Sequence, residues 1–271
     1  MNKSKNEYIK FWEKFGAVLK EGIHEDFNNK DDLLNISLFM SSKTNEWSSL
    51  SEVVSRMKPN QEEIYYISGE NKETLLNSPQ METFLKNDVE VLLLTDPVDE
   101  FWIPNVNDFN KKKFKSITKG SVDIKKFSDL KDAPKEKKDK QNTKEIDGLI
   151  TFLKSHYSDK VKNVKVSERL TSSPVCFVAD ENDMDIHLEN LLKKHKHLEK
   201  VASKVLEINP DNNIIKYLSK LDYSKDKVLA EEAANILLDQ AKIMEGIPLE
   251  DNKSFCTNIN NLLMRSLASS K

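Results

Sequence analysis

The chain is 271 residues long, with charged residues at 32% of its positions and hydrophobic residues at 38%. A typical domain has roughly 100–150 residues, so this length predicts two medium-sized domains. The formal net charge of -3 excludes a general attraction to nucleic acid or to anionic membranes, because both partners require a clear positive excess.

The sequence also argues against a membrane span, a secretory signal and a metal site. The apolar run at 91–94 falls far short of the roughly 20 residues that cross a bilayer. The N-terminus has no apolar run before a small-residue cleavage site, so we expect a cytoplasmic protein. Cys176 and Cys256 stand alone in mainly apolar surroundings, which favours two buried free thiols over a disulfide or a metal pair.

Helices are predicted first along the chain. Apolar residues at helical spacing predict a helix over 4–21, another over 29–40 and a short third over 49–57, with Ser49 or Ser51 as its N-cap.

Strands follow. The runs at 62–68 and 89–95 are compact and rich in branched or aromatic residues, and 114–118 is a weaker third. A helical crossover at 71–88 separates the first two. Strand, helix and strand in this order predict a βαβ unit with a parallel pair of strands.

Residues 125–144 hold eight lysines and four acids, with few apolar side chains. A nucleic-acid patch is one interpretation, but the segment has no arginine for bidentate contact and only one aromatic residue, Phe127, instead of the interleaved set that stacking requires. A solvated junction is favoured. We therefore place a first domain at 1–124, a linker at 125–142 and a second domain at 143–271.

The second domain has an α+β pattern. A helix is predicted over 145–157, and strands are predicted over 161–167, 173–179 and 203–208. A further amphipathic helix is expected over 181–195. Together with the βαβ unit, these elements give a fold class of α/β in the first domain and α+β in the second.

The chain ends in a predicted helical hairpin, formed by 225–246 and 252–267. Apolar residues surround the first of these helices almost completely, so a hairpin on its own would leave an apolar face uncovered. A second copy of the chain could cover it in a dimeric four-helix bundle. The alternative is packing of the hairpin on the preceding strands.

Sequence motifs for catalysis are absent. The chain contains no GxGxxG, GxxxxGK[ST], HExxH or GxSxG pattern, and its six glycines make a phosphate-cradling loop implausible. Neighbouring carboxylates are better explained as solvated faces than as an acid–base dyad. We expect a chain without enzymatic activity, acting through non-covalent contacts.

The segment "TDPVDEFWIPNV" at 95–106 carries apolar residues in an unusual place. Asp96 before Pro97 predicts a helix start, and Pro104 limits the helix to about two turns. Its apolar cluster is Phe101, Trp102 and Ile103. Consecutive helical residues differ by about 100°, so at least one of the three should reach the surface. Such a residue is either a lone exposed apolar group or part of a contact patch rimmed by carboxylates.

The predicted helix at 181–195 leaves two interpretations open. Met184, Leu188 and Leu192 lie at helical spacing together with Leu191 and His195. A stripe of this kind faces either the core of its own domain or a partner.

Six blocks of the sequence resemble one family, in its order and at compatible spacing. They are "FWEKFGAVLKEGIHED", "SRMKPNQEEIYYISGE", "VEVLLLTDPVDEF", "ERLTSSPV", "EINPDN" and "LLDQAKIMEG". The chain thereby resembles the heat shock protein 90 chaperones, in their bacterial HtpG type. The resemblance covers the later part of the family's middle domain, at about 1–125, and its C-terminal dimerisation domain, at about 143–271.

The resemblance implies a fragment of an ATP-dependent chaperone that assists protein folding. The family's ATP-binding domain and its catalytic arginine region have no counterpart here, so ATP and Mg²⁺ are expected only in a full-length parent. Expected partners are unfolded client proteins, a second copy of the chain and other chaperones, with no nucleic acid or membrane.

Functional residues are carried over from the family position by position. Client contacts are expected at Glu100, Phe101, Trp102 and Ile103, and also at Met184, Leu188 and Leu192. Pro104 departs from the bacterial pattern beside the first group. Dimerisation is expected through Ile236, Leu237, Leu238, Ile259, Leu262, Leu263 and Met264. The rival interpretation is a scaffold or dimerisation module whose apolar groups are all internal.

Overall fold

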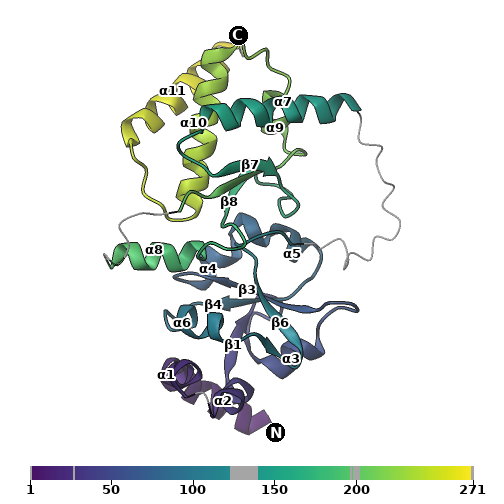
Figure 1. Cartoon of the computed structure of the whole chain (residues 1–271), viewed down its shortest axis with the longest axis vertical. Helices are drawn as coiled ribbons and strands as arrows, with labels where there is room; N and C mark the ends of the chain where they lie inside the picture. Colours follow the sequence, from purple (N-terminus) through teal and green to yellow (C-terminus); the bar gives the residue numbers. More distant parts are fainter. Residues whose placement is uncertain (1, 27, 123–139, 196, 198–201, 270–271) are drawn as a thin grey trace. The chain divides into compact units, whose positions relative to one another are not determined.

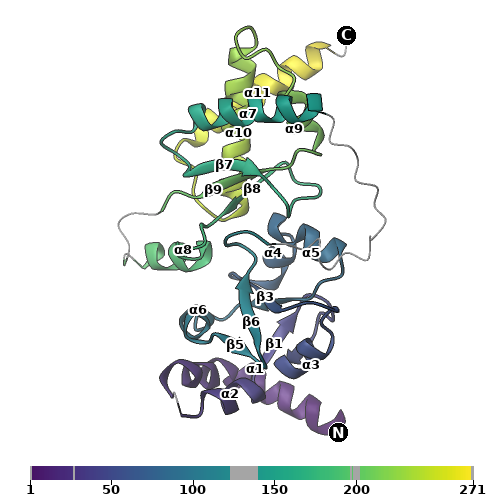
Figure 2. The same cartoon turned by 45° about the vertical axis from the view of Figure 1, so that its right-hand side comes forward.

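The computed structural model describes residues 2–26, 28–122, 140–195, 197 and 202–269 (Figures 1 and 2). Within these ranges the chain forms two compact units. The first runs to Ile117 and includes Val122, and the second comprises Thr118–Ser121 and the residues from 140 onward. The predicted linker at 125–142 lies mostly outside the described residues, and its last three residues belong to a helix that begins at Lys140.

The first unit is built on a six-stranded sheet with the order β2-β1-β4-β3-β6-β5. The strands are β1 (Leu38–Ser41), β2 (Trp47–Ser49), β3 (Glu63–Ser68), β4 (Val91–Leu94), β5 (Asp108–Phe109) and β6 (Lys112–Ser116). Strand β3 pairs in parallel with β4 and with β6, with Ile67 opposite Leu93. Strand β4 lies between β3 and the antiparallel strand β1, and all four of its residues are buried, as expected for a strand in the middle of a sheet. The predicted parallel pair is therefore confirmed.

Short helices connect these strands and a long one precedes them. They are α1 (Asn2–Glu25), α2 (Lys30–Ile36), α3 (Leu50–Ser55), α4 (Lys72–Leu76), η1 (Pro79–Met81), α5 (Glu82–Lys86), α6 (Asp99–Trp102) and η2 (Ile103–Asn105). Ser49 caps α3 in a reciprocal capping box with Glu52, as one of the two predicted caps. The crossover at 71–88 is interrupted, because Pro79 cannot continue a helix.

The predicted helix at 29–40 is wrong in its last part. Helix α2 ends at Ile36, and Ser37 adopts an extended conformation. Residues 38–40 instead belong to β1, where Phe39 pairs with Ser48 and Met40 with Leu93. Pairing on both sides outweighs the helical spacing of this short apolar run.

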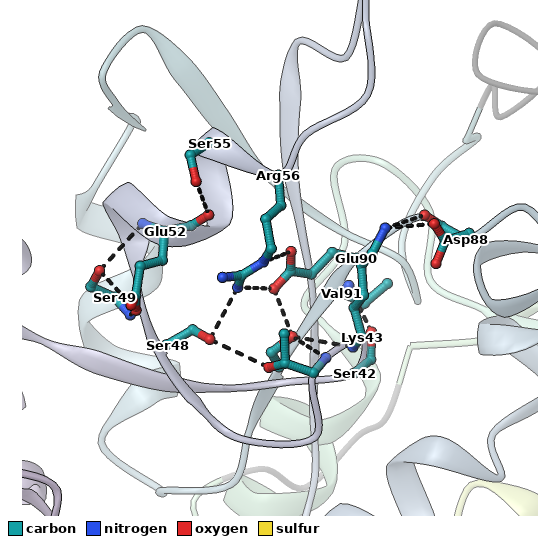
Figure 3. A network of polar contacts seen from close by, with 12 residues as sticks. Ser42, Lys43, Ser48, Ser49, Glu52, Ser55, Arg56, Asp88, Glu90 and Val91 are labelled. Atoms are coloured by element: carbon teal, nitrogen blue, oxygen red, sulfur yellow. Dashed lines mark hydrogen bonds and ion pairs between the residues drawn. The ribbon is translucent and has the colours of Figure 1, made fainter. Parts of the chain in front are cut away.

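A polar network joins α3 to the sheet (Figure 3). Arg56 donates two hydrogen bonds to Glu90, from Nε at 3.0 Å and from Nη2 at 2.6 Å. Ser41 of β1 donates to the same carboxylate at 2.6 Å, and Arg56 also donates to Ser48 of β2 at 3.0 Å. Glu90 is buried, so these donors supply the partners that its charge requires inside the protein.

The second unit has a three-stranded sheet with the order β7-β9-β8. Its strands are β7 (Asn163–Val166), β8 (Val175–Val178) and β9 (Val205–Ile208), with β7 parallel and β8 antiparallel to β9. Its helices are α7 (Lys140–His156), α8 (Ile186–Lys194), α9 (Asn213–Leu218), α10 (Lys227–Met244) and α11 (Asn252–Ser269). The three predicted strands are confirmed, and α7, α9 and α10 share one core with them.

A buried ion pair lies on this second sheet. Glu207 of β9 accepts from Nε of Arg169 at 3.0 Å and from the hydroxyl of Ser167 at 2.6 Å. Both charged side chains are 3% exposed. Arg169 also donates to the carbonyl oxygen of Gly120, so the guanidinium connects the sheet to the segment 118–121.

Both cysteines are free thiols, as predicted, but only Cys176 is buried. The predicted burial of Cys256 is wrong because its side chain lies on the exposed face of α11. In the described part of the chain no helix is long and apolar enough to cross a membrane. The same part holds no group of histidine, cysteine and carboxylate side chains that could bind a metal ion.

Candidate functional site

The segment after β4 begins α6 later than predicted. Helix α6 starts at Asp99, with Val98 at the N-cap position, so the predicted cap at Asp96 is wrong. The carboxylate of Asp96 instead accepts from Nζ of Lys20 at 2.6 Å and is therefore not used as a cap. Asp99 and Glu100 do lie in the first turn, where they complement the helix dipole. The predicted two turns are one α turn followed by the 3-10 turn η2, which contains Pro104.

The three apolar residues of this segment are divided between core and surface. Trp102 and Ile103 are buried, whereas the side chain of Phe101 is 47% exposed. The prediction that at least one of the three reaches the surface is confirmed. The predicted client contacts at Glu100, Trp102 and Ile103 need correction, because these side chains are only 3%, 0% and 6% exposed. Phe101 is the predicted residue of this group that a partner can touch directly.

Aromatic packing and one hydrogen bond hold Trp102 inside. Its ring lies 5.6 Å from the ring of Phe39 and 5.8 Å from that of Phe114, measured between centroids. Its indole nitrogen donates to Oδ1 of Asp99 at 2.7 Å. A buried tryptophan that finds an acceptor in this way contributes its whole apolar surface to the core.

Lys20 is part of this site, and it was missed in the sequence. Its side chain is 3% exposed and its Nζ lies 2.9 Å from Oδ1 of Asp99. Burial raises the pKa of the Asp99 carboxyl, while Lys20 and the hydrogen bond from Trp102 oppose that rise. The signal was the position of Lys20, four residues after Gly16 and three before Ile23, on the buried face of α1.

The second predicted contact surface runs from Met184, before α8 (Ile186–Lys194), along this helix to Leu192. Met184 is 44% exposed but precedes the helix, since α8 begins at Ile186 and is capped by Asp185. Leu188 and Leu192 are partly buried, while Ile186 and Glu189 are the buried members of the helix. The predicted stripe is therefore neither fully buried in the core nor fully exposed to a partner.

The terminal hairpin buries part of its predicted dimerisation set. Leu237 and Leu238 lie in the core of their own unit, so they need correction as direct dimer contacts. This face of α10 packs on the strands of its own unit, which was the alternative prediction. Ile236, Ile259 and Leu262 are partly buried. Leu263 and Met264 are 55% and 67% exposed.

An exposed apolar stripe on α1 was also missed. Phe11, Phe15 and Val18 are 43%, 51% and 62% exposed. The rings of Phe11 and Phe15 lie 5.2 Å apart. Their spacing of four and three residues places them on one face, next to the face that Trp12 buries.

Comparison with known proteins gives consistent results over the whole chain. A family model described as "Hsp90 protein" matches residues 1–271. The chaperone protein HtpG of Roseobacter denitrificans is 41% identical over 268 residues, which cover 98% of this chain and 43% of that protein. HtpG of Mesorhizobium japonicum is 39% identical over 262 residues, covering 96% of this chain and 41% of the relative. HtpG of Wolbachia pipientis wMel is 39% identical over 260 residues, with 95% and 41% covered. The chain spans about two fifths of the length of these curated relatives.

Proposed function

The chain belongs to the Hsp90 family of heat shock chaperones, and we propose that it is a non-catalytic part of an HtpG-type chaperone that binds unfolded or partly folded proteins. The observation that carries this proposal is Phe101, an aromatic side chain 47% exposed beside the fully buried Trp102. An apolar group held at the surface by its own fold is suited to contact apolar segments of other proteins.

Binding at each of the two candidate surfaces should be weak and reversible. Burial of apolar area contributes roughly 25 cal/mol per Å2, and the ordering of a mobile partner opposes it. Phe101 offers one aromatic ring, and Met184 offers a flexible thioether chain that adapts to different partners. Weak contacts of this kind suit a chaperone, which has to release its clients.

Replacing Phe101 and Met184 by serine should lower the ability of the chain to suppress aggregation. The reason is that both substitutions remove exposed apolar surface without opening the core. Light scattering of a chemically denatured test protein, diluted into buffer with each variant, measures the effect. Ile214→Ser is the matched control, because Ile214 on α9 is 51% exposed and lies outside both predicted surfaces.

The rival interpretation, a scaffold without a client surface, makes the opposite prediction. It requires Phe101→Ser/Met184→Ser to suppress aggregation as well as the unchanged chain does. Equal loss in Ile214→Ser would also contradict our assignment, since it would indicate that any exposed apolar residue contributes.

We further propose that the hairpin of α10 and α11 mediates homodimerisation. Its two helices are joined by a hydrogen bond from Asn261 to Glu232 at 2.8 Å and by an ion pair from Arg265 to Glu232 at 2.8 Å. These contacts leave Leu263, Met264 and Leu267 exposed on α11. A second copy could cover these residues by a two-fold arrangement of the same face.

Leu263→Asp together with Met264→Asp should convert a dimer into a monomer, because each buried carboxylate at a symmetric interface would face apolar surface. Sedimentation equilibrium at micromolar concentration measures the mass. Ile214→Asp serves as the control for a charge on exposed apolar surface elsewhere in the unit. A mass that does not differ between Leu263→Asp/Met264→Asp and the control would contradict the interface.

The proposal assigns no cofactor to this chain and places ATP and Mg²⁺ with a longer parent protein in the cytoplasm. Isothermal titration of the chain with Mg²⁺–ATP should therefore give no binding heat. Saturable binding would contradict this part of the proposal and would indicate a nucleotide site assembled from residues that form no recognisable motif.

A further inference from the structure

Helix α6 cannot set its own orientation. It has four residues and its N-cap makes no side-chain hydrogen bond. A single turn of helix is unfavourable by itself, because several backbone dihedrals are ordered for one hydrogen bond. The direction in which Phe101 points must therefore be determined by contacts from other elements.

Contacts from α1 can determine the orientation of α6. Nζ of Lys20 lies 2.6 Å from Asp96, before the helix, and 2.9 Å from Asp99, at its first residue. The same ammonium lies 5.1 Å from the ring centre of Phe39, against which Trp102 packs. Lys20 thus touches the turn before α6, the helix itself and the wall of its aromatic pocket.

Asp99 connects Lys20 to the other residues of α6 through its own hydrogen bonds. Besides Lys20, its carboxylate accepts from the indole of Trp102 at 2.7 Å and from the backbone nitrogen of Asp96 at 3.2 Å. These donors fix the rotation of α6 about its axis. Trp102 and Ile103 are both directed inward, and at about 100° per residue Phe101 then lies on the outward side of the turn.

A second contact from α1 lies one turn further along. Nδ2 of Asn105 lies 3.0 Å from Nδ1 of His24, and it also donates to the carbonyl oxygen of Phe101 at 2.8 Å. Lys20 and His24 are four residues apart and lie on neighbouring positions of one helix face. The segment that carries Phe101 is therefore held by α1 before and after the exposed residue.

We propose that Lys20 is a positioning residue, which orients α6 through Asp99 and thereby holds Phe101 on the surface for client binding. The inference rests on the proposed function. A buried ion pair often stabilises a protein no more than apolar residues of similar volume would. The need to orient α6 therefore explains a charged side chain at position 20 better than a gain in protein stability does.

The test uses Lys20→Met together with Asp99→Asn. Methionine retains the apolar stem of lysine, and asparagine retains an acceptor for the indole of Trp102, while Asp96 is 33% exposed at its side chain and can be hydrated. The control is Lys14→Met, at an exposed position of the same helix. Three quantities are measured on the whole chain: the melting temperature, the suppression of aggregation, and the hydrogen exchange of the tryptophan indole N–H groups by ¹⁵N NMR.

In Lys20→Met/Asp99→Asn we expect faster indole exchange at Trp102, unchanged exchange at the buried Trp12, and suppression of aggregation reduced to the level of Phe101→Ser. A purely structural role would accelerate exchange at both tryptophans and lower the melting temperature. That result would overturn the proposal, as would unchanged exchange at Trp102. Faster exchange with normal suppression would also overturn it, provided that Phe101→Ser reduces suppression.

The proposed function and this inference can fail separately. If Phe101→Ser has no effect on aggregation, client binding at this residue fails, and exchange at Trp102 alone decides whether Lys20 orients α6. If Lys20→Met/Asp99→Asn does not unfold cooperatively, Asp99→Asn alone is examined in the same way, because Lys20 then keeps Asp96 as its partner. Unchanged exchange in that variant would overturn the proposal.

Discussion

Replacing Glu207 by alanine should lower the free energy of unfolding of the second unit by about 3–5 kcal/mol, the cost of leaving a buried charge without its partner. Glu207 and Arg169 are each 3% exposed, and Nε of Arg169 donates to the carboxylate at 3.0 Å. Arginine cannot lose its charge inside a protein. The guanidinium would remain buried, where it still donates to the carbonyl oxygen of Gly120 but no longer faces a negative charge from Glu207.

Chemical denaturation followed by far-UV circular dichroism measures this loss. A matched surface pair provides the control: Asp211→Ala removes the partner of Lys216 at 3.7 Å, where the carboxylate is 85% exposed, and should change stability little. Replacing both buried partners, as Arg169→Met/Glu207→Leu, should recover part of the loss. A loss in Glu207→Ala no larger than that in Asp211→Ala would contradict the buried position of this pair.

Elements with strong local signals were predictable from the sequence. The apolar run of β4, the aromatic and branched run of β3, and the cap of α3 by Ser49 are formed as expected. Their signals lie within a few residues of one another. The short run at 38–40 was not predictable in the same way, because its strand conformation depends on pairing with β2 and β4.

The sequence predicts that the candidate site has an exposed apolar residue, but not which residue it is. The angle between consecutive helical residues predicts that at least one of the three apolar side chains is exposed. That Phe101 is the exposed one depends on the bond from Trp102 to Asp99 and on the contact of Asp99 with Lys20, which lies 79 residues earlier in the chain. Leu237 and Leu238 illustrate the same limit, since a helix that is apolar nearly all round does not reveal which face its own sheet covers.

Trp102→Ala should lower the free energy of unfolding of the first unit by about 3–5 kcal/mol, whereas Phe101→Ala, at the adjacent position, should change it by less than about 1 kcal/mol. The difference arises from burial, since Trp102 is fully buried between Phe39 and Phe114 and Phe101 is 47% exposed. Removal of the indole also deprives the buried Asp99 of a hydrogen-bond donor.

Thermal and chemical unfolding of the two alanine variants test this difference in stability. Trp102→Phe separates the effect of lost packing from the effect of the lost hydrogen bond to Asp99. Phenylalanine would retain most of the packing but not the donor to Asp99. The loss in free energy of unfolding should therefore lie between those of the two alanine variants. Aggregation assays should show the reverse order at low temperature, with Phe101→Ala the more impaired of the alanine variants wherever Trp102→Ala is still folded. Equal losses of stability at the two positions would contradict the inward direction of Trp102. That direction leaves Phe101 free to contact a partner, because a turn that directs Trp102 and Ile103 inward directs Phe101 outward.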